Sequence, residues 1–140
     1  MQTTRGINGG PDHFGIRTVR GTRFRYIRNF TPKATFQNAA TKDPTFKTWR
    51  KTAAAGDSHA RWLVHDFQHR PAEELYDCET DPSNRQNLTH DPKLAGKIAE
   101  LRTKPDAWMK QQGDAGQPTE MKALERVPRN RAAKNGSATE

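Results

Sequence analysis

The chain has 140 residues, with 24 basic against 16 acidic side chains and a formal net charge of +8. Leu, Ile, Val and Phe supply only 19 residues, so we expect a small core and some chain that cannot pack by itself. No apolar run is long enough to span a membrane, the first ten residues lack the apolar stretch of a signal peptide, and one cysteine, Cys78, excludes an internal disulfide or a cysteine-based zinc site.

The positive charge is concentrated in the first half of the chain. Residues 1–72 hold 13 basic and 4 acidic side chains, whereas residues 73–114 hold 6 basic and 9 acidic ones. A basic half prefers an anionic partner, such as nucleic acid, a sulfated or phosphorylated substrate, or an acidic protein surface. The alternative is a solvated basic surface, and the charge balance alone favours that alternative.

A basic hairpin is expected near the start of the chain. Residues 1–13 are rich in glycine and polar side chains and indicate a loop. Residues 14–20 and 22–30 then form two strands around Gly21. Alternation places the aromatic residues Phe24, Tyr26 and Phe30 on one face and Arg23, Arg25 and Asn29 on the other, with Ile27 as the exception. Base stacking needs aromatic and basic residues on one face, so we prefer an ordinary half-buried hairpin to a nucleic-acid site.

Two helices are predicted after an irregular connector at residues 31–42. The first begins with Asp43 as N-cap and Pro44 as first residue, and it ends at Gly56. The second begins at Asp57 or Ser58 and ends before Pro71. Their apolar stripes are Phe46, Trp49 and Ala53 in the first helix, and Ala60, Leu63, Val64 and Phe67 in the second.

The second half contains one short strand and one longer helix. Residues 74–77 are the strand candidate, and Asp91-Pro92 begins a helix that ends at Gly113. Its apolar stripe comprises Leu94, Ile98, Leu101 and Trp108. Pro105 lies inside that stripe and predicts a kink or break near Lys104. Residues 115–140 show little periodicity and are predicted to be a disordered tail.

The residues by themselves supply no catalytic set and no metal site. His65 and His69 are spaced for one helical face, but they lack further ligands, so two surface histidines are favoured. Residues 77–81 have the acidic spacing of a calcium loop, but Pro82 occupies the position that requires glycine. The chain also lacks the common nucleophile-elbow, P-loop and dinucleotide-binding patterns.

Four stretches resemble the C-terminal subdomain of sulfatases. Residues 15–30 resemble the strand pair that opens this subdomain. Residues 70–77, with Asp81-Pro82 and Asn87-Leu88, resemble the family's Glu-Leu-Tyr-Asp, Asp-Pro and Asn-Leu signature, and residues 101–109 resemble its terminal helix. The insert at residues 31–38, together with Trp49, is similar to the branch that includes heparan N-sulfatase (N-sulfoglucosamine sulfohydrolase). The resemblance covers roughly residues 5–114.

The resemblance implies an α+β fold. A small antiparallel sheet of about four strands, packed helices and a C-terminal helix would occupy residues 14–114 and dock on a large α/β catalytic domain. In the family that domain carries a calcium ion and a formylglycine made from the cysteine of Cys-x-Pro-x-Arg. Cys78 lies in a different context and stands where the family has an aliphatic residue, while Pro105 replaces a helix-forming apolar residue. No catalytic residue, metal ligand or cofactor is therefore assigned to this chain.

The loop before the first strand approaches the substrate pocket in sulfatases. Asp12, His13 and Arg17 are therefore predicted to contact a sulfated sugar, because His and Arg donate charge-assisted hydrogen bonds to sulfate. A purely local hydrogen-bonding role is the alternative for His13. The implied reaction is hydrolysis of a sulfate ester or sulfamate on a sugar, with this chain as a fragment inactive by itself. The alternatives are a non-enzymatic module that binds polyanions and a chain that complements a separate catalytic half.

Overall fold

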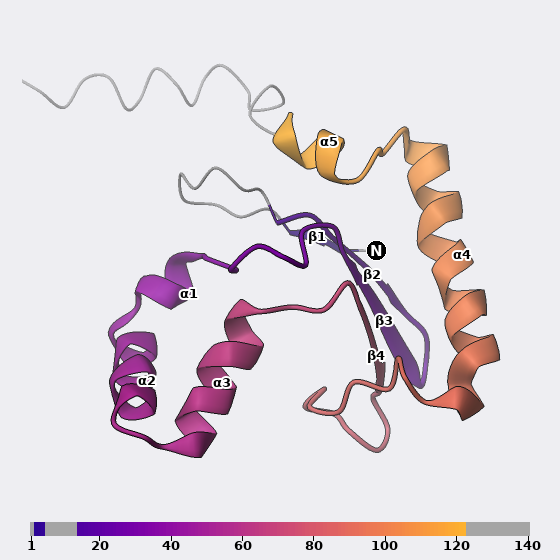
Figure 1. Cartoon of the computed structure of the whole chain (residues 1–140). Helices are drawn as coiled ribbons and strands as arrows, with labels where there is room; N and C mark the ends of the chain where they lie inside the picture. The colour runs from indigo at the N-terminus through magenta and orange to yellow at the C-terminus, as the bar shows by residue number, and fades with distance from the viewer. Residues whose placement is uncertain (1, 5–13, 123–140) are drawn as a thin grey trace, which may run out of the picture.

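The computed structural model describes residues 2–4 and 14–122. It shows an α+β fold built on a four-stranded antiparallel sheet in the order β1-β2-β3-β4 (Figure 1). The strands are β1 (Gln2–Thr4), β2 (Ile16–Arg20), β3 (Phe24–Asn29) and β4 (Glu73–Asp77). The predicted fold class and the predicted hairpin around Gly21 are confirmed. The prediction of a loop throughout residues 1–13 is wrong for Gln2–Thr4, because pairing along the edge of β2 makes this segment a strand.

The helices are α1 (Ala39–Lys42), α2 (Pro44–Ala54), α3 (Ser58–Gln68), the 3₁₀ turn η1 (Pro92–Leu94), α4 (Ala95–Gln112) and α5 (Gln117–Met121). The predicted starts of α2 and α3 are confirmed by the capping bonds of Asp43 and Asp57, whereas Asp91 caps the 3₁₀ turn η1 and α4 itself begins at Ala95. Asp43 accepts from Thr45 N at 2.7 Å, Asp57 from Ala60 N at 2.7 Å, and Asp91 from Lys93 N at 2.9 Å. Gly56 and Gly113 follow the ends of α2 and α4 with φ of 102° and 63°, which other residues rarely adopt.

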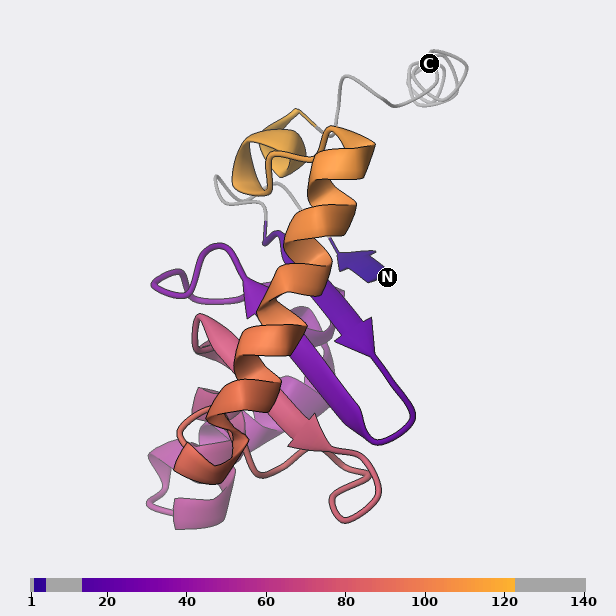
Figure 2. The same ribbon diagram turned by 90° about the vertical axis from the view of Figure 1, so that its right-hand side faces the viewer.

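Helix α4 covers one face of the sheet and encloses the main core. Figure 2 shows it lying across the strands. Tyr26 of β3 and its register partner Leu75 of β4 are fully buried against Ile98 and Leu101 of α4. Alternation along β3 therefore gives this face its apolar residues, as the sequence predicted. No helix in the described part of the chain has both the length and the hydrophobicity needed to cross a bilayer.

Helix α4 continues through Pro105, so the predicted break near Lys104 is wrong. Proline removes one backbone hydrogen bond and disfavours the preceding turn. Pro105 is fully buried, however, on the side of α4 that also buries Ile98 and Leu101. Burial of this stripe offsets the lost hydrogen bond.

Two segments predicted to be irregular contain short helices. The connector at residues 31–42 includes α1, which Asn38 caps through a reciprocal pair of hydrogen bonds with Thr41. The predicted tail at residues 115–140 includes α5, whose Glu120 is buried. Residues 123–140 lie outside the described residues. Both helices span one turn or little more, so their sequences carry no clear periodicity.

Four phenylalanine rings connect the α2–α3 pair to the start of the sheet. Phe14 contacts Phe36 with ring centroids 5.0 Å apart, Phe36 contacts Phe67 at 6.0 Å, and Phe67 contacts Phe46 at 5.3 Å. These helices lie on the side of the sheet opposite α4 (Figure 1). The aromatic series therefore forms a second, smaller core beside the first.

Candidate functional site

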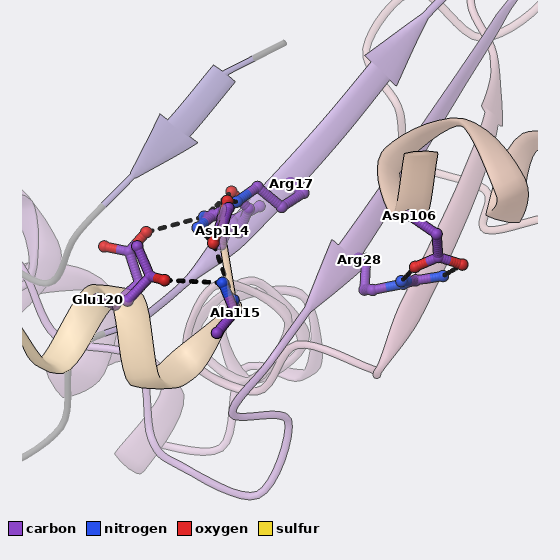
Figure 3. Close-up of polar contacts among 9 residues, drawn as sticks. Arg17, Arg28, Asp106, Asp114, Ala115 and Glu120 are labelled. Carbon is purple, nitrogen blue, oxygen red and sulfur yellow. Dashed lines mark hydrogen bonds and ion pairs between the residues drawn. The ribbon is translucent and has the colours of Figure 1, made fainter. Parts of the chain in front are cut away.

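Of the three predicted substrate contacts, the structure describes Arg17. Asp12 and His13 lie outside the described residues. Arg17 is in β2, and its side chain is only 1% exposed. Its Nε donates to Asp114 at 2.5 Å, one Nη donates to Asp114 at 2.8 Å, and the other donates to Glu120 at 2.8 Å and to the Ile16 carbonyl at 3.0 Å (Figure 3).

These contacts make Arg17 the centre of a buried ion cluster. Four of its five N–H donors are bonded to residues that the structure describes. Burial opposes the charge, but the Asp114 and Glu120 carboxylates outweigh it and raise the pKa of Arg17. The Arg17 guanidinium in turn lowers the pKa of Asp114. The geometry gives Arg17 a positioning role between β2 and the α4–α5 junction, and its contact with a sulfated sugar stays a prediction.

The backbone fits closely around this cluster. The guanidinium of Arg17 lies over the Phe30 ring at 5.4 Å. A Cβ atom on Gly116 would lie 2.8 Å from the same ring, and one on Gly15 would lie 2.8 Å from the Glu120 side chain. Gly116 also has a φ of 73°. At position 116, only glycine combines this positive φ with the absence of a Cβ atom that would displace Phe30.

Sequence reasoning missed the two acidic partners of Arg17. Asp114 and Glu120 are 97 and 103 residues away from it in the chain. The available local signal was Pro118 near the start of a helix followed by Thr119 and Glu120, placed just after Gly113. That signal predicts a helical turn, but it does not identify the strand on which the turn packs.

Two other arginines of the hairpin are also paired with carboxylates. Arg28 forms an ion pair with Asp106 of α4, visible beside the Arg17 cluster in Figure 3. Arg23 donates to one oxygen of Asp77 at 2.7 and 2.9 Å. The bond from Arg23 lowers the pKa of Asp77. These pairs stabilise the hairpin and account for part of its positive charge.

Arg20 and Arg25 differ from the paired arginines. They are direct register partners on β2 and β3, so their Cβ atoms are near neighbours on the sheet face away from α4. The side chain of neither arginine forms a hydrogen bond or an ion pair with any residue that the structure describes. Two adjacent guanidiniums without a counter-charge are suited to an anionic group such as a sulfate or a carboxylate.

The signature segment has a structural role at the outer edge of β4. Asn87 accepts from Leu75 N at 3.0 Å and donates to the Glu73 carbonyl at 3.1 Å, and Leu88 N donates to the Leu75 carbonyl at 2.8 Å. Asp81 shapes the intervening turn by accepting from two backbone N–H groups. The segment thereby satisfies backbone groups that an edge strand would otherwise expose.

Another buried carboxylate, that of Glu74, lies on the sheet face away from α4. Glu74 accepts from Asn29 at 2.7 Å and from the Tyr76 hydroxyl at 2.6 Å, with Arg70 at 3.4 Å. Burial and this carboxylate raise the pKa of Tyr76. Because Glu74 accepts from donors on three sides, it fixes the positions of Asn29, Arg70 and Tyr76.

The calcium and formylglycine chemistry of sulfatases does not fit the described residues. Within residues 2–4 and 14–122, no group of three or more His, Cys, Asp or Glu side chains is arranged to hold a metal ion. Cys78 is half-buried, its sulfur lies 3.9 Å from the Asn84 amide oxygen, and the sequence after it lacks the Pro and Arg of the formylglycine motif. No catalytic step is therefore derived from this chain.

The fold and the polar clusters define a small α+β module in which the ionic groups that the structure describes have mainly structural roles.

No family model matches the chain. An ulvan-active sulfatase of Formosa agariphila is 33% identical over 102 residues, which cover 71% of this chain and 17% of that protein. A second ulvan-active sulfatase of the same organism is 30% identical over 101 residues, covering 72% of this chain and 18% of that protein.

The chain is thus a relative of sulfatases, as the resemblance predicted. It spans less than a fifth of the length of the curated relatives that it matches.

Proposed function

We propose that this chain is the C-terminal subdomain of a sulfatase-family hydrolase. The observation that carries this proposal is its similarity to two ulvan-active sulfatases over 71% and 72% of its length, although it covers only 17% and 18% of theirs. The parent reaction would be hydrolysis of a sulfate ester or sulfamate on a sulfated sugar. The insert at residues 31–38 with Trp49 favours an N-sulfoglucosamine sulfohydrolase-like branch.

The partner that we propose is a larger sulfatase catalytic domain. The signature residues of this chain maintain its own sheet edge, which is the role expected of a supporting subdomain. The nucleophile and the calcium site would belong to the larger domain, so the isolated chain is expected to be inactive. The loop with Asp12 and His13 would reach the sugar, while Arg17 anchors the strand that follows it.

A chimera tests the proposal directly. The segment of the ulvan-active sulfatase that aligns with this chain is replaced by this chain, and turnover of a sulfated substrate is compared with that of the isolated chain. We expect turnover from the chimera and none from the isolated chain. A soluble, folded chimera without activity, or metal-dependent turnover by the isolated chain, would contradict the proposal.

The same chimera tests the predicted sugar contact. His13→Ala should lower turnover, whereas His90→Ala, which changes an exposed histidine far along the chain, should not. Equal activities of the two variants would refute the role of His13. Reading the genomic DNA upstream of Met1 in all three frames is an independent check, because the proposal expects it to encode Cys-x-Pro-x-Arg.

The unpaired arginines favour a second candidate function, the binding of polyanions without catalysis. Arg20 and Arg25 leave two adjacent positive charges without a described counter-charge. Retention on heparin that survives high salt, and that Arg20→Gln combined with Arg25→Gln abolishes, would support a specific site. Elution at modest salt, unchanged in that variant, would show only general charge attraction.

A further inference from the structure

An aromatic hollow lies among α1, α2 and α3, away from the Arg17 cluster. Its volume is about 390 Å³, within the range of small-molecule sites. Phe46, Trp49 and Phe67 line it together with two alanines of α1, and Asp43 and Thr45 add polar groups. The hollow was not predicted from the sequence, which placed Trp49 in the apolar stripe of its helix.

Trp49 is the distinctive residue of this hollow. Its side chain is 37% exposed, whereas its neighbour Phe46 is buried. The two ring centroids lie 6.0 Å apart, and Phe46 is held in turn by Phe67 at 5.3 Å. The wall of the hollow is therefore fixed by packing before any ligand binds, and a pre-formed site loses less entropy on binding.

The other exposed tryptophan of this helix pair provides a contrast. Trp62 of α3 is 40% exposed, but His59 stacks on its ring at 6.0 Å and the Arg85 guanidinium lies over it at 5.4 Å. Among the described residues, Trp49 has no cationic partner and no ring contact other than Phe46. The exposed ring of Trp62 is thus already covered by side chains of the same chain, whereas Trp49 presents apolar surface to solvent.

The helical segment that forms most of the hollow carries an excess of positive charge, which attracts anionic groups to its vicinity. Residues 39–54 contain four cations and one carboxylate, and none of the four cations forms a salt bridge within the described part of the chain. The cations are Lys42, Lys47, Arg50 and Lys51; none of them lines the hollow, and helical spacing places Lys47 and Lys51 on the side of α2 away from Phe46 and Trp49. Asp43 caps α2 by accepting from Thr45 N at 2.7 Å, and it also interacts with the Thr45 side chain and with the charge of Lys47. The hollow therefore combines an aromatic wall with a polar rim at Asp43 and Thr45, on a segment with an excess of positive charge.

We propose that this hollow binds one sugar ring of a sulfated polysaccharide. The apolar C–H face of the ring would pack against Trp49, and ring hydroxyls would bond to Asp43 and Thr45. Sulfate groups on neighbouring sugars would be attracted by the cations of α1 and α2. The choice of a sulfated sugar rests on the proposed function, but the site itself is independent of the catalytic domain.

The test measures binding by the full chain through isothermal titration calorimetry, whose signal does not depend on Trp49, with a heparin hexasaccharide as the probe. Trp49→Ala is expected to weaken binding about tenfold, because truncation of a buried aromatic contact removes much of a site's affinity. Trp62→Ala is the matched control and should change the affinity less than about twofold. Circular dichroism verifies that both variants fold. Equal affinities of the wild type and the Trp49 variant would overturn the proposal.

Two further probes identify the ligand class. A desulfated hexasaccharide should bind more weakly than the sulfated one, and polyglutamate should show no dependence on Trp49. Trp49-dependent binding of polyglutamate would overturn the proposal in favour of a protein-docking surface. Because these assays need no turnover, the hollow can fail while the chimera is active, and the chimera can fail while the hollow binds sugar.

Discussion

Replacement of Arg17 tests the buried ion cluster most directly. Arg17→Met keeps an apolar stem in β2 but leaves Asp114 and Glu120 without their guanidinium. Breaking a buried pair in this way costs about 3–5 kcal/mol, mainly because a charge stays buried without a partner. Asp114 retains the Gly116 N–H at 2.8 Å, so we expect about 3 kcal/mol, at the lower end of that range.

The assay is urea unfolding of the whole chain, followed by circular dichroism. With a slope of about 2 kcal/mol per molar urea, a loss of about 3 kcal/mol lowers the midpoint by about 1.5 M. If the wild-type chain unfolds at very low urea, a fixed concentration of trimethylamine N-oxide raises the stability of both proteins. Lys97→Met is the control, because its pair with Glu100 is exposed and its loss should leave the urea midpoint nearly unchanged.

The loss in the Arg17 variant should depend on pH in a defined direction. Arg17 holds the pKa of the Asp114 carboxyl below its ordinary value, so the pair stabilises the fold above about pH 4 and is lost as the pH falls. In Arg17→Met the Asp114 carboxyl no longer has the guanidinium that lowers its pKa, so it protonates more readily in acid and its unpaired charge is removed. The difference from wild type should therefore be largest at pH 7 and shrink toward pH 4.

A compensated variant separates charge from packing. Asp114→Asn and Glu120→Gln, added to Arg17→Met, remove all three charges and should recover most of the lost stability. An equal loss at pH 7 and pH 4, with no recovery in the triple variant, would refute the reasoning and assign the effect to packing alone.

Three further predictions concern the backbone, the sheet edge and acid stability. Gly116→Ala should destabilise the fold by about 1–3 kcal/mol in thermal unfolding, because the φ of 73° at Gly116 and the nearby Phe30 ring both oppose a Cβ atom. The control is Gly96→Ala in α4, which should stabilise the fold by up to about 1 kcal/mol. Asn87→Ala should cost about 1–3 kcal/mol by leaving a buried N–H of β4 unpaired, whereas exposed Gln86→Ala should be neutral. The wild-type chain should lose stability as the pH falls below about 4, because a paired guanidinium lowers the pKa of Asp77, and an unchanged urea midpoint at pH 3 would contradict this.

Local patterns in the sequence predicted the hairpin and most of the helix ends. Asp43-Pro44 and Asp57 begin helices because a carboxylate satisfies the first free N–H groups, an interaction that involves residues two or three apart. Gly113 ends α4 because its left-handed backbone conformation is open to glycine. Alternation in β3 identified Tyr26 as a core residue, since the two faces of a strand differ in burial.

The candidate sites depended on contacts that no local pattern contains. Arg17 bonds to Asp114, which is 97 positions away in the sequence. Asn87 bonds to two residues of β4 that are 12 and 14 positions away. The hollow at Trp49 exists because α3 supplies Phe67 beside α2, while the apolar spacing of α2 alone predicted a covered ring. In the same way, burial against the sheet keeps α4 continuous through Pro105. The sequence alone therefore determined the fold class, the hairpin and most helix ends, which depend on neighbouring residues. Only the tertiary structure decided which charges are neutralised and that the Trp49 ring stays exposed to solvent, because those outcomes depend on segments brought together by packing.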